Sequence, residues 1–231
     1  MRNSHLKLIT RVVLIVSVLF ASKSITHAAP VPIPGLRPTG VSSGAFFTTL
    51  PDFSVDPHYK LIQALGGFGP NAFVASPRPS SWVPNQPLSK WISPDGTNSV
   101  LLSGLYVYQL TFDLTGLDPS TASISGLWTA DDNSRVVLNG NFGAGVVQTT
   151  TFGQFDSFTF NSGFVPGINT LDFRVGNAFF PGGDKGGPSG LHVTQLLGFA
   201  EPIPEPSSLM LLGVSGFALA TRRRNRTTQP L

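Results

Sequence analysis

The sequence predicts an all-β protein whose body is an antiparallel β-sandwich. Of its 231 residues, 25 are glycine, 20 are proline and 18 are phenylalanine, and only 12% are charged. Between Phe46 and Phe199, apolar and polar residues mostly alternate in short runs that Gly, Pro, Asn and Asp separate. This period of two, with frequent turn formers, is typical of sandwiches and barrels.

The first part of the domain is rich in glycine and proline. Residues 29–44 alternate these residues with Val, Ile and Ser, which predicts a stiff, extended linker before a domain at 45–201. Residues 53–62 predict an opening strand. The loop that follows at 65–79 is expected to send two phenylalanines into the core, namely Phe68 and Phe73.

The middle of the domain shows the clearest alternation. Residues 104–114 predict a strand with one apolar face, formed by Tyr106, Tyr108, Leu110, Phe112 and Leu114. Asp118-Pro119-Ser120 predicts a turn, because proline presets φ. Residues 122–130 predict the next strand, with Ile124 and Trp128 in it.

The last strands are separated by further turns. Asn139-Gly140 after residues 135–138 predicts a hairpin, because a type I′ turn needs positive φ at both central residues. Residues 155–160 predict a strand with Phe158 and Phe160 inward. The final strands are expected at 170–175 and 190–197.

The order of several short motifs carries a resemblance to a known fold. These motifs are Leu138-Asn139-Gly140, Val165-Pro166-Gly167-Ile168-Asn169, Val175-Gly176-Asn177 and Pro188-Ser189-Gly190-Leu191. Their order is similar to that of galactose-binding-like domains, which include sugar-binding modules attached to glycoside hydrolases. The resemblance implies a jelly-roll fold, although a fold does not determine a function.

Residues 1–28 have the pattern of a secretory signal peptide. Three basic residues precede an apolar core at 12–21, and small residues follow it. Cleavage is expected after Ala28. An uncleaved N-terminal anchor is the alternative.

The C-terminal segment 202–226 has three parts. Pro204-Glu205-Pro206 precedes an apolar run at 207–221, which is short for a membrane helix because a standard span needs about 20 residues. A basic tail at 222–226 follows, and such tails stay in the cytoplasm, which places the body outside. The basic residues of this tail are Arg222, Arg223, Arg224 and Arg226.

This three-part segment resembles the PEP-CTERM sorting signal of exported proteins of Gram-negative bacteria. The resemblance implies that exosortase, a membrane-embedded cysteine protease, recognises Pro204-Glu205-Pro206. It further implies passage through the inner membrane, a transient or permanent membrane anchor, and then a place at the cell surface or in the extracellular matrix. The alternative is a chance Pro-Glu-Pro before a simple tail anchor.

The charge and cysteine content exclude several kinds of function. Outside the two terminal segments, residues 29–201 carry seven basic and eleven acidic residues, a formal net charge of −4. This acidic body argues against nucleic-acid binding, which calls for a basic face. The chain has no cysteine, so it forms no disulfide and has no thiolate nucleophile or metal ligand.

Few residues are candidates for catalysis. After the signal peptide, the chain has two histidines, His58 and His192, and two histidines do not make a three-histidine zinc site. No serine lies in a Gly-x-Ser-x-Gly motif. Both glutamates lie outside the predicted strands, which disfavours the paired carboxylates of glycoside hydrolases. We therefore expect no catalytic residue and no enzyme activity.

Two binding sites remain as candidates. Trp82 and Trp91 lie beside predicted loops, where exposed rings stack on sugars, but core packing explains them equally well. Asp131, Asp132 and Asn133 offer oxygen ligands for Ca²⁺. A turn held by side chain to backbone hydrogen bonds is the alternative, and no other cofactor is expected.

The residues and resemblances together predict an exported surface or extracellular-matrix protein with a non-catalytic body. Because chains with this sorting signal are often associated with bacteria that make exopolysaccharide, association with exopolysaccharide or biofilm is expected. A carbohydrate-binding module is the alternative, and a hydrolase is the third hypothesis.

Overall fold

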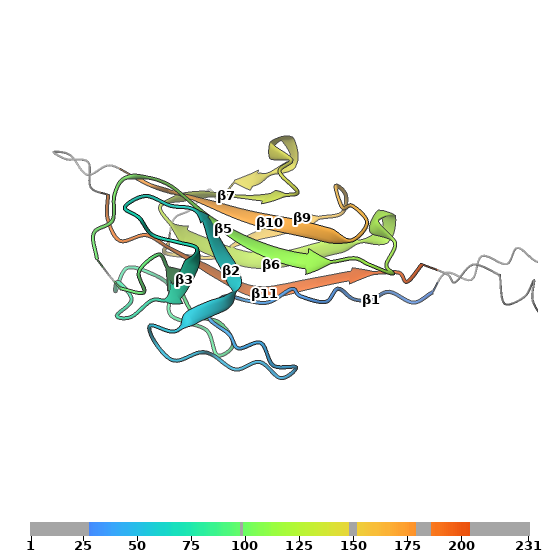
Figure 1. Ribbon diagram of the computed structural model, residues 1–231, viewed down its shortest axis with the longest axis horizontal. Helices are drawn as coiled ribbons and strands as arrows, with labels where there is room; N and C mark the ends of the chain where they lie inside the picture. The colour runs from blue at the N-terminus through green and yellow to red at the C-terminus, as the bar shows by residue number, and fades with distance from the viewer. Residues whose placement is uncertain (1–27, 98, 148–151, 179–185, 204–231) are drawn as a thin grey trace, which may run out of the picture.

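The computed structural model describes residues 28–97, 99–147, 152–178 and 186–203 (Figure 1). In these residues the chain forms eleven strands and two short 3₁₀ helices. The strands are β1 (Val31–Pro32), β2 (Val55–Gln63), β3 (Asn71–Val74), β4 (Ile92–Ser93), β5 (Gly104–Asp113), β6 (Ser123–Asp131), β7 (Asn133–Leu138), β8 (Val146–Val147), β9 (Asp156–Phe160), β10 (Ile168–Asn177) and β11 (Gly190–Ala200). The 3₁₀ helices are η1 (Pro119–Thr121) and η2 (Phe142–Ala144).

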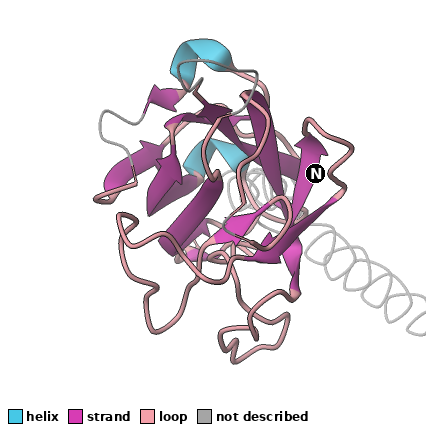
Figure 2. Ribbon diagram, turned by 90° about the vertical axis from the view of Figure 1, so that its left-hand side faces the viewer, coloured by secondary structure: helices cyan, strands magenta, loops and turns pink. Residues whose placement is uncertain are grey.

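All strand pairings between the described residues are antiparallel. The hydrogen-bonded path runs β8-β7-β10-β5-β2-β3-β4-β11-β6-β9, and β1 pairs with β11. Figure 1 shows this path folded over, so that β7, β10 and β5 lie above β6 and β11. Figure 2 shows the strands curving around a common interior. The predicted all-β antiparallel sandwich is confirmed.

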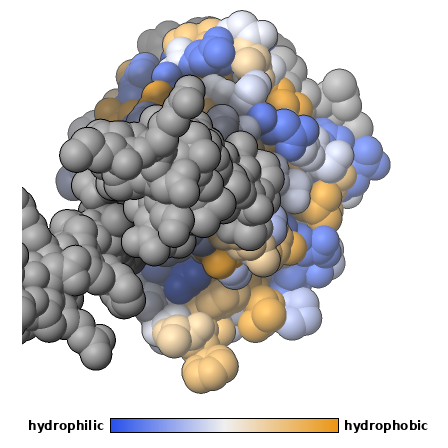
Figure 3. All heavy atoms as spheres, turned by 90° about the vertical axis from the view of Figure 1, so that its right-hand side faces the viewer, coloured by the Kyte–Doolittle hydropathy of each residue, from blue (hydrophilic) through white to orange (hydrophobic). Residues whose placement is uncertain are grey.

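The core lies between the two layers. The predicted inward face of β5 is buried, and Phe158 and Phe160 of β9 are 2% and 4% exposed. Phe158 meets Phe173 of β10 edge-on, with 5.8 Å between the ring centroids. Aromatic rings from β9 and β10 therefore fill the interior. On the face of Figure 3, hydrophobic and hydrophilic residues are interspersed.

Residues 29–44 belong to the folded body and do not form a free linker. Ile33, Leu36 and Val41 are buried, and the N–H of Ile33 donates to the carbonyl of Gly198. Proline has no N–H to donate, so a proline-rich strand fits only at a sheet edge. The segment occupies such an edge, beside β11.

Residues 65–79 contain a strand where a loop was expected. In β3, Ala72 and Val74 are buried and Phe73 is partly exposed, and Phe68 is 37% exposed. The prediction that Phe68 fills the core was wrong. The short strand uses a small inward residue, Ala72, which leaves little periodicity to detect.

The turn after β7 has the predicted backbone but a longer connection. Asn139 has φ of 49° and Gly140 has φ of 69°, so both positive angles are confirmed. Val136 pairs with Val146, with η2 between them. The connection therefore exceeds a two-residue hairpin loop.

The described body ends just after β11, where the chain is hydrogen-bonded to the loop around η1. The carbonyl of Glu201 accepts from the N–H of Asp118, and the N–H of Ile203 donates to the carbonyl of Gly116. The signal-peptide core, Pro204-Glu205-Pro206, the apolar run at 207–221 and the arginine cluster lie outside the described residues. None of the helices among the described residues has the length and apolar character that a membrane span requires.

Candidate functional site

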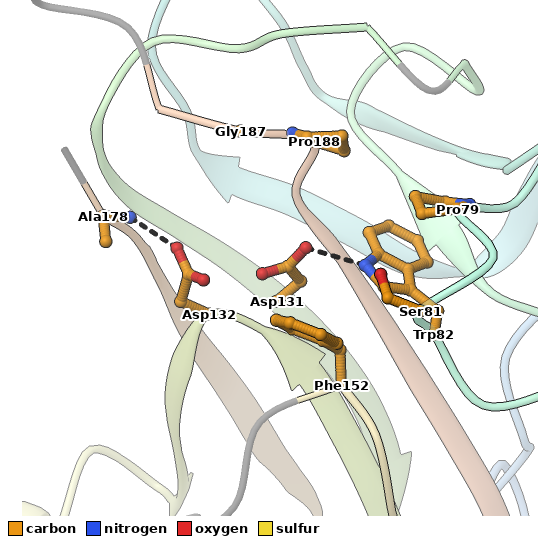
Figure 4. Close-up of a pocket in the computed structure, with 9 residues that line it drawn as sticks. All are labelled: Pro79, Ser81, Trp82, Asp131, Asp132, Phe152, Ala178, Gly187 and Pro188. Atoms are coloured by element: carbon orange, nitrogen blue, oxygen red, sulfur yellow. Dashed lines mark hydrogen bonds between the residues drawn. The ribbon is translucent and has the colours of Figure 1, made fainter. Parts of the chain in front are cut away.

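A pocket of about 350 Å³ opens at the turn between β6 and β7 (Figure 4). Segments far apart in the sequence meet there: the connection between β3 and β4, the end of β6, and the chain just after β10 and just before β11. The lining residues are Pro79, Ser81, Trp82, Asp131, Asp132, Phe152, Ala178, Gly187 and Pro188.

Two adjacent carboxyl groups provide the polar part of the pocket. Asp131 is the last residue of β6 and is 7% exposed. Its Oδ2 accepts a hydrogen bond of 2.7 Å from the indole Nε1 of Trp82. Oδ2 of Asp132 accepts from the backbone N–H of Ala178, also at 2.7 Å. Figure 4 shows these two bonds on opposite sides of the pocket.

The environment of Asp131 favours its protonated form. Burial raises the pKa of Asp131 to about 8, and the neighbouring Asp132 carboxyl acts in the same direction. The Trp82 N–H opposes this by lowering the pKa. Asp131 therefore carries a proton at neutral pH and serves as both a hydrogen-bond donor and an acceptor.

Trp82 and Trp91 are buried, at 2% and 0% exposure. Their ring centroids lie 4.1 Å apart, and Nε1 of Trp91 donates to the carbonyl of Val83. Neither ring offers the exposed face that sugar stacking needs, so core packing explains both. The close approach of Trp82 requires Gly190, because a Cβ there would lie 2.7 Å from Cη2 of the indole. Trp82 nevertheless reaches the pocket, where its N–H binds Asp131.

The predicted calcium ligands do not converge. Asp131 and Asp132 face the pocket, whereas Asn133, the first residue of β7, lines a separate hollow. Ca²⁺ takes six to eight oxygen ligands and requires ionised carboxylates. Burial raises the pKa of Asp131, which disfavours the ionised form, and no group of three or more His, Cys, Asp or Glu gathers among the described residues. The residues present therefore do not fit Ca²⁺.

His192 is a core residue. It is 0% exposed, and its Nε2 lies 2.8 Å from Oγ of the buried Ser89. Burial lowers the pKa of His192 to about 3, so the ring is neutral. Within the described residues Nδ1 has no hydrogen-bond partner, so no carboxylate orients the ring as in a catalytic triad. The structure therefore shows a packed histidine.

The C-terminal segment matches a known family model. A model described as the PEP-CTERM protein-sorting motif covers residues 202–224. The chain carries a PEP-CTERM motif. The resemblance predicted from the sequence is thereby confirmed. A PEP-CTERM motif indicates export and sorting at the membrane.

Two solved structures are similar to this chain. One is the carbohydrate-binding module TmCBM61 in complex with β-1,4-galactotriose, at 13% identity and a TM-score of 0.34, over 56% of this chain and 82% of that chain. The other is the Podospora anserina GH26-CBM35 β-(1,4)-mannanase, at 13% identity and a TM-score of 0.26. It is matched over 78% of this chain and 29% of the mannanase chain. Likenesses at these TM-scores carry no argument about function. The comparison with curated proteins found no match.

The PEP-CTERM match begins directly at the folded body. Its first residue, Pro202, forms a bridge with Leu117. The last described residue, Ile203, is hydrogen-bonded to Gly116. The sandwich therefore continues without a linker up to Pro204-Glu205-Pro206.

Sequence reasoning found the two parts of the pocket but not their proximity. Trp82 and Asp131 are 49 residues apart in the chain and were assigned to different candidate sites. Phe152 was not singled out. Its N–H donates to the carbonyl of Ala130, and its carbonyl accepts from Val83. No local pattern reports these contacts between distant segments.

Proposed function

We propose that this protein is exported, sorted by exosortase through its PEP-CTERM motif, and binds carbohydrate at the cell surface or in the extracellular matrix with a non-catalytic sandwich. The observation that carries the binding proposal is the pocket that Asp131 and Asp132 line together with the side chains of Trp82 and Phe152. Exopolysaccharide is the ligand expected in this location.

The chemistry of the pocket suits a single sugar unit. Its volume of about 350 Å³ is near the lower end of ligand pockets, which run from about 300 to 1,000 Å³. Sugar hydroxyl groups donate to Asp132, and the protonated Asp131 exchanges hydrogen bonds as donor and acceptor. The ring of Phe152 provides an apolar wall for a sugar C–H face.

The geometry of the two carboxyls favours binding over glycoside hydrolysis. Retaining glycosidases hold their carboxyls about 5 Å apart, and inverting enzymes hold them about 6.5–9.5 Å apart. Asp131 and Asp132 are instead neighbours at one turn, and each accepts a hydrogen bond from the protein, from Trp82 and from Ala178, so they do not face each other across a cleft. A water-activating carboxyl dyad is the remaining enzyme hypothesis, because such dyads also place two carboxyl groups beside each other.

Binding is tested by titrating the purified full-length protein with neutral oligosaccharides in a calorimeter. We expect Asp132→Asn and Phe152→Ala each to weaken binding about tenfold, because each removes a direct contact. Asp113→Asn is the matched control, since it removes the same charge from the last residue of β5, which does not line the pocket. Unchanged affinity in both pocket variants would sink the binding proposal. Release of shorter products, abolished in Asp131→Asn, would show an enzyme.

Sorting is tested by the intact mass of the protein recovered from cells with and without exosortase activity. We expect loss of the chain beyond about Pro206 only where exosortase is active. Replacement of Pro204-Glu205-Pro206 by alanines is expected to leave the tail in place. The same shortened mass without exosortase activity would contradict the proposal.

A further inference from the structure

Two arginines lie directly opposite each other on neighbouring strands. Arg135 of β7 pairs with Arg174 of β10 in the antiparallel register. Like charges in this position destabilise a sheet. Within the described residues, no carboxylate forms an ion pair or hydrogen bond with either guanidinium. Among the described residues, the repulsion between the two guanidinium groups is therefore not offset by a carboxylate contact.

Both side chains are held in place by their surroundings. The guanidinium carbon of Arg174 lies 4.9 Å from the ring centroid of Phe142, which is a cation–π contact. The stem of Arg135 lies against Gly145, where a Cβ would come within 2.9 Å of Cδ. A side chain at this position would have to displace the stem, so η2 and the residue after it contribute to the placement of both arginines.

The two arginines line a hollow of about 310 Å³ on the outer face of the sheet. Phe142 borders it and is 52% exposed, so one side of the hollow is an open aromatic ring. The lining residues are Leu105, Asn133, Ser134, Arg135, Phe142, Arg174 and Gly176.

The charges around the hollow leave it positive. The acid beside it in the register is Asp172, two residues before Arg174 on β10, and it pairs with Val137 and Gln109. Its Oδ1 accepts from Nε2 of Gln109 at 2.9 Å. The positive charge of the hollow lies on a body whose formal net charge is −4, so it is a local feature of this face.

We propose that this hollow binds a carboxylate-bearing sugar of an acidic polysaccharide. The planar guanidinium groups match the two oxygens of a carboxylate, and binding would offset the repulsion between them. The exposed ring of Phe142 packs against the sugar ring. The site shares no lining residue with the pocket at Asp131 and Trp82 and goes beyond the function proposed for it.

The test compares polygalacturonate with its fully methyl-esterified form, which has the same backbone without the charges. We expect the purified full-length protein to bind the acid form and not the ester, with affinity that falls as salt rises. Arg135→Gln and Arg174→Gln are each expected to weaken binding about tenfold. Lys60→Gln is the matched control, because Lys60 is an exposed cation on β2, which pairs with β5 in the same sheet, and it does not line the hollow.

Further readouts separate this site from a general charge effect and from the first pocket. The melting temperature of unliganded Arg135→Gln is expected to equal or exceed that of the wild type, because repulsion is removed. Asp132→Asn and Phe152→Ala are expected to retain polygalacturonate binding, whatever their effect on neutral sugars. Equal loss in Lys60→Gln, wild-type affinity in both arginine variants, or equal affinity for inorganic phosphate would each overturn the proposal.

Discussion

Replacement of Trp128 by alanine is expected to lower the free energy of unfolding by about 3–5 kcal/mol. Trp128 is 0% exposed at the centre of β6 and meets Phe158 edge-on, with 5.5 Å between ring centroids. Its Nε1 donates to Oγ of Ser134, which is also buried. The truncation leaves a large cavity between the layers and removes this bond, and denaturant unfolding followed by circular dichroism measures the loss.

Two further variants make this result specific. Trp128→Phe keeps most of the volume and is expected to cost less than the alanine variant. Phe46→Ala removes an aromatic ring that is 96% exposed and is expected to change stability by less than about 0.5 kcal/mol. A loss below about 1 kcal/mol for Trp128→Ala would contradict its role in the core.

The second large effect is a pH dependence of the free energy of unfolding, which the substitution Asp131→Asn is expected to remove. The pKa of Asp131 in the folded protein, about 8, lies above its ordinary value of 3.8, so the folded state holds a proton that the unfolded chain releases. Its stabilising contribution is complete below pH 4 and is lost as pH rises through 8. Between pH 6.5 and 8 we expect the free energy of unfolding to fall by up to about 1.4 kcal/mol per pH unit.

Asparagine resembles the protonated acid and still accepts from the Trp82 N–H, so the variant is expected to show a flat profile in this range. Chemical denaturation at several pH values measures it. Asp113→Asn is the control, because a hydrogen bond from Thr115 lowers the pKa of Asp113 and places its titration in acid. The decrease in the free energy of unfolding with pH must therefore remain in Asp113→Asn. If the same decrease persists in Asp131→Asn, Asp131 is not its cause.

His192 contributes to the pH dependence of stability at lower pH, and its contribution has the opposite sign. Its pKa in the folded protein, about 3, lies below its ordinary value of 6.5, so only the unfolded chain takes up a proton between these values. Stability from this residue is present above pH 6.5 and is lost on acidification. Between pH 6.5 and 8, the stability change due to Asp131 is therefore separate from that due to His192.

The strands with clear alternation were predictable because the information is local. β5, β6, β9 and β10 bury the faces that a period of two assigns to them. Asn139 and Gly140 adopt the positive φ that their residue types favour. By contrast, β1 and β3 were missed, since their short, proline-flanked sequences have almost no period and depend on pairing with β11 and β4.

The binding residues were only partly predictable. Asp131 and Trp82 were singled out for their chemistry, and core packing was one alternative for Trp82, but the hydrogen bond between them was not expected. The pair of Arg135 and Arg174 had no signal in the sequence, because its meaning depends on the register of β7 with β10.

The sequence by itself determined the all-β class, the main strands and turns, the absence of cysteine chemistry and the PEP-CTERM motif. Each of these is encoded by neighbouring residues or by composition. The tertiary structure alone decided which tryptophans are buried, where Asp131 meets Trp82, and that two arginines face each other. These properties arise from contacts between segments distant in the chain, and burial and electrostatics depend on which segments fold together.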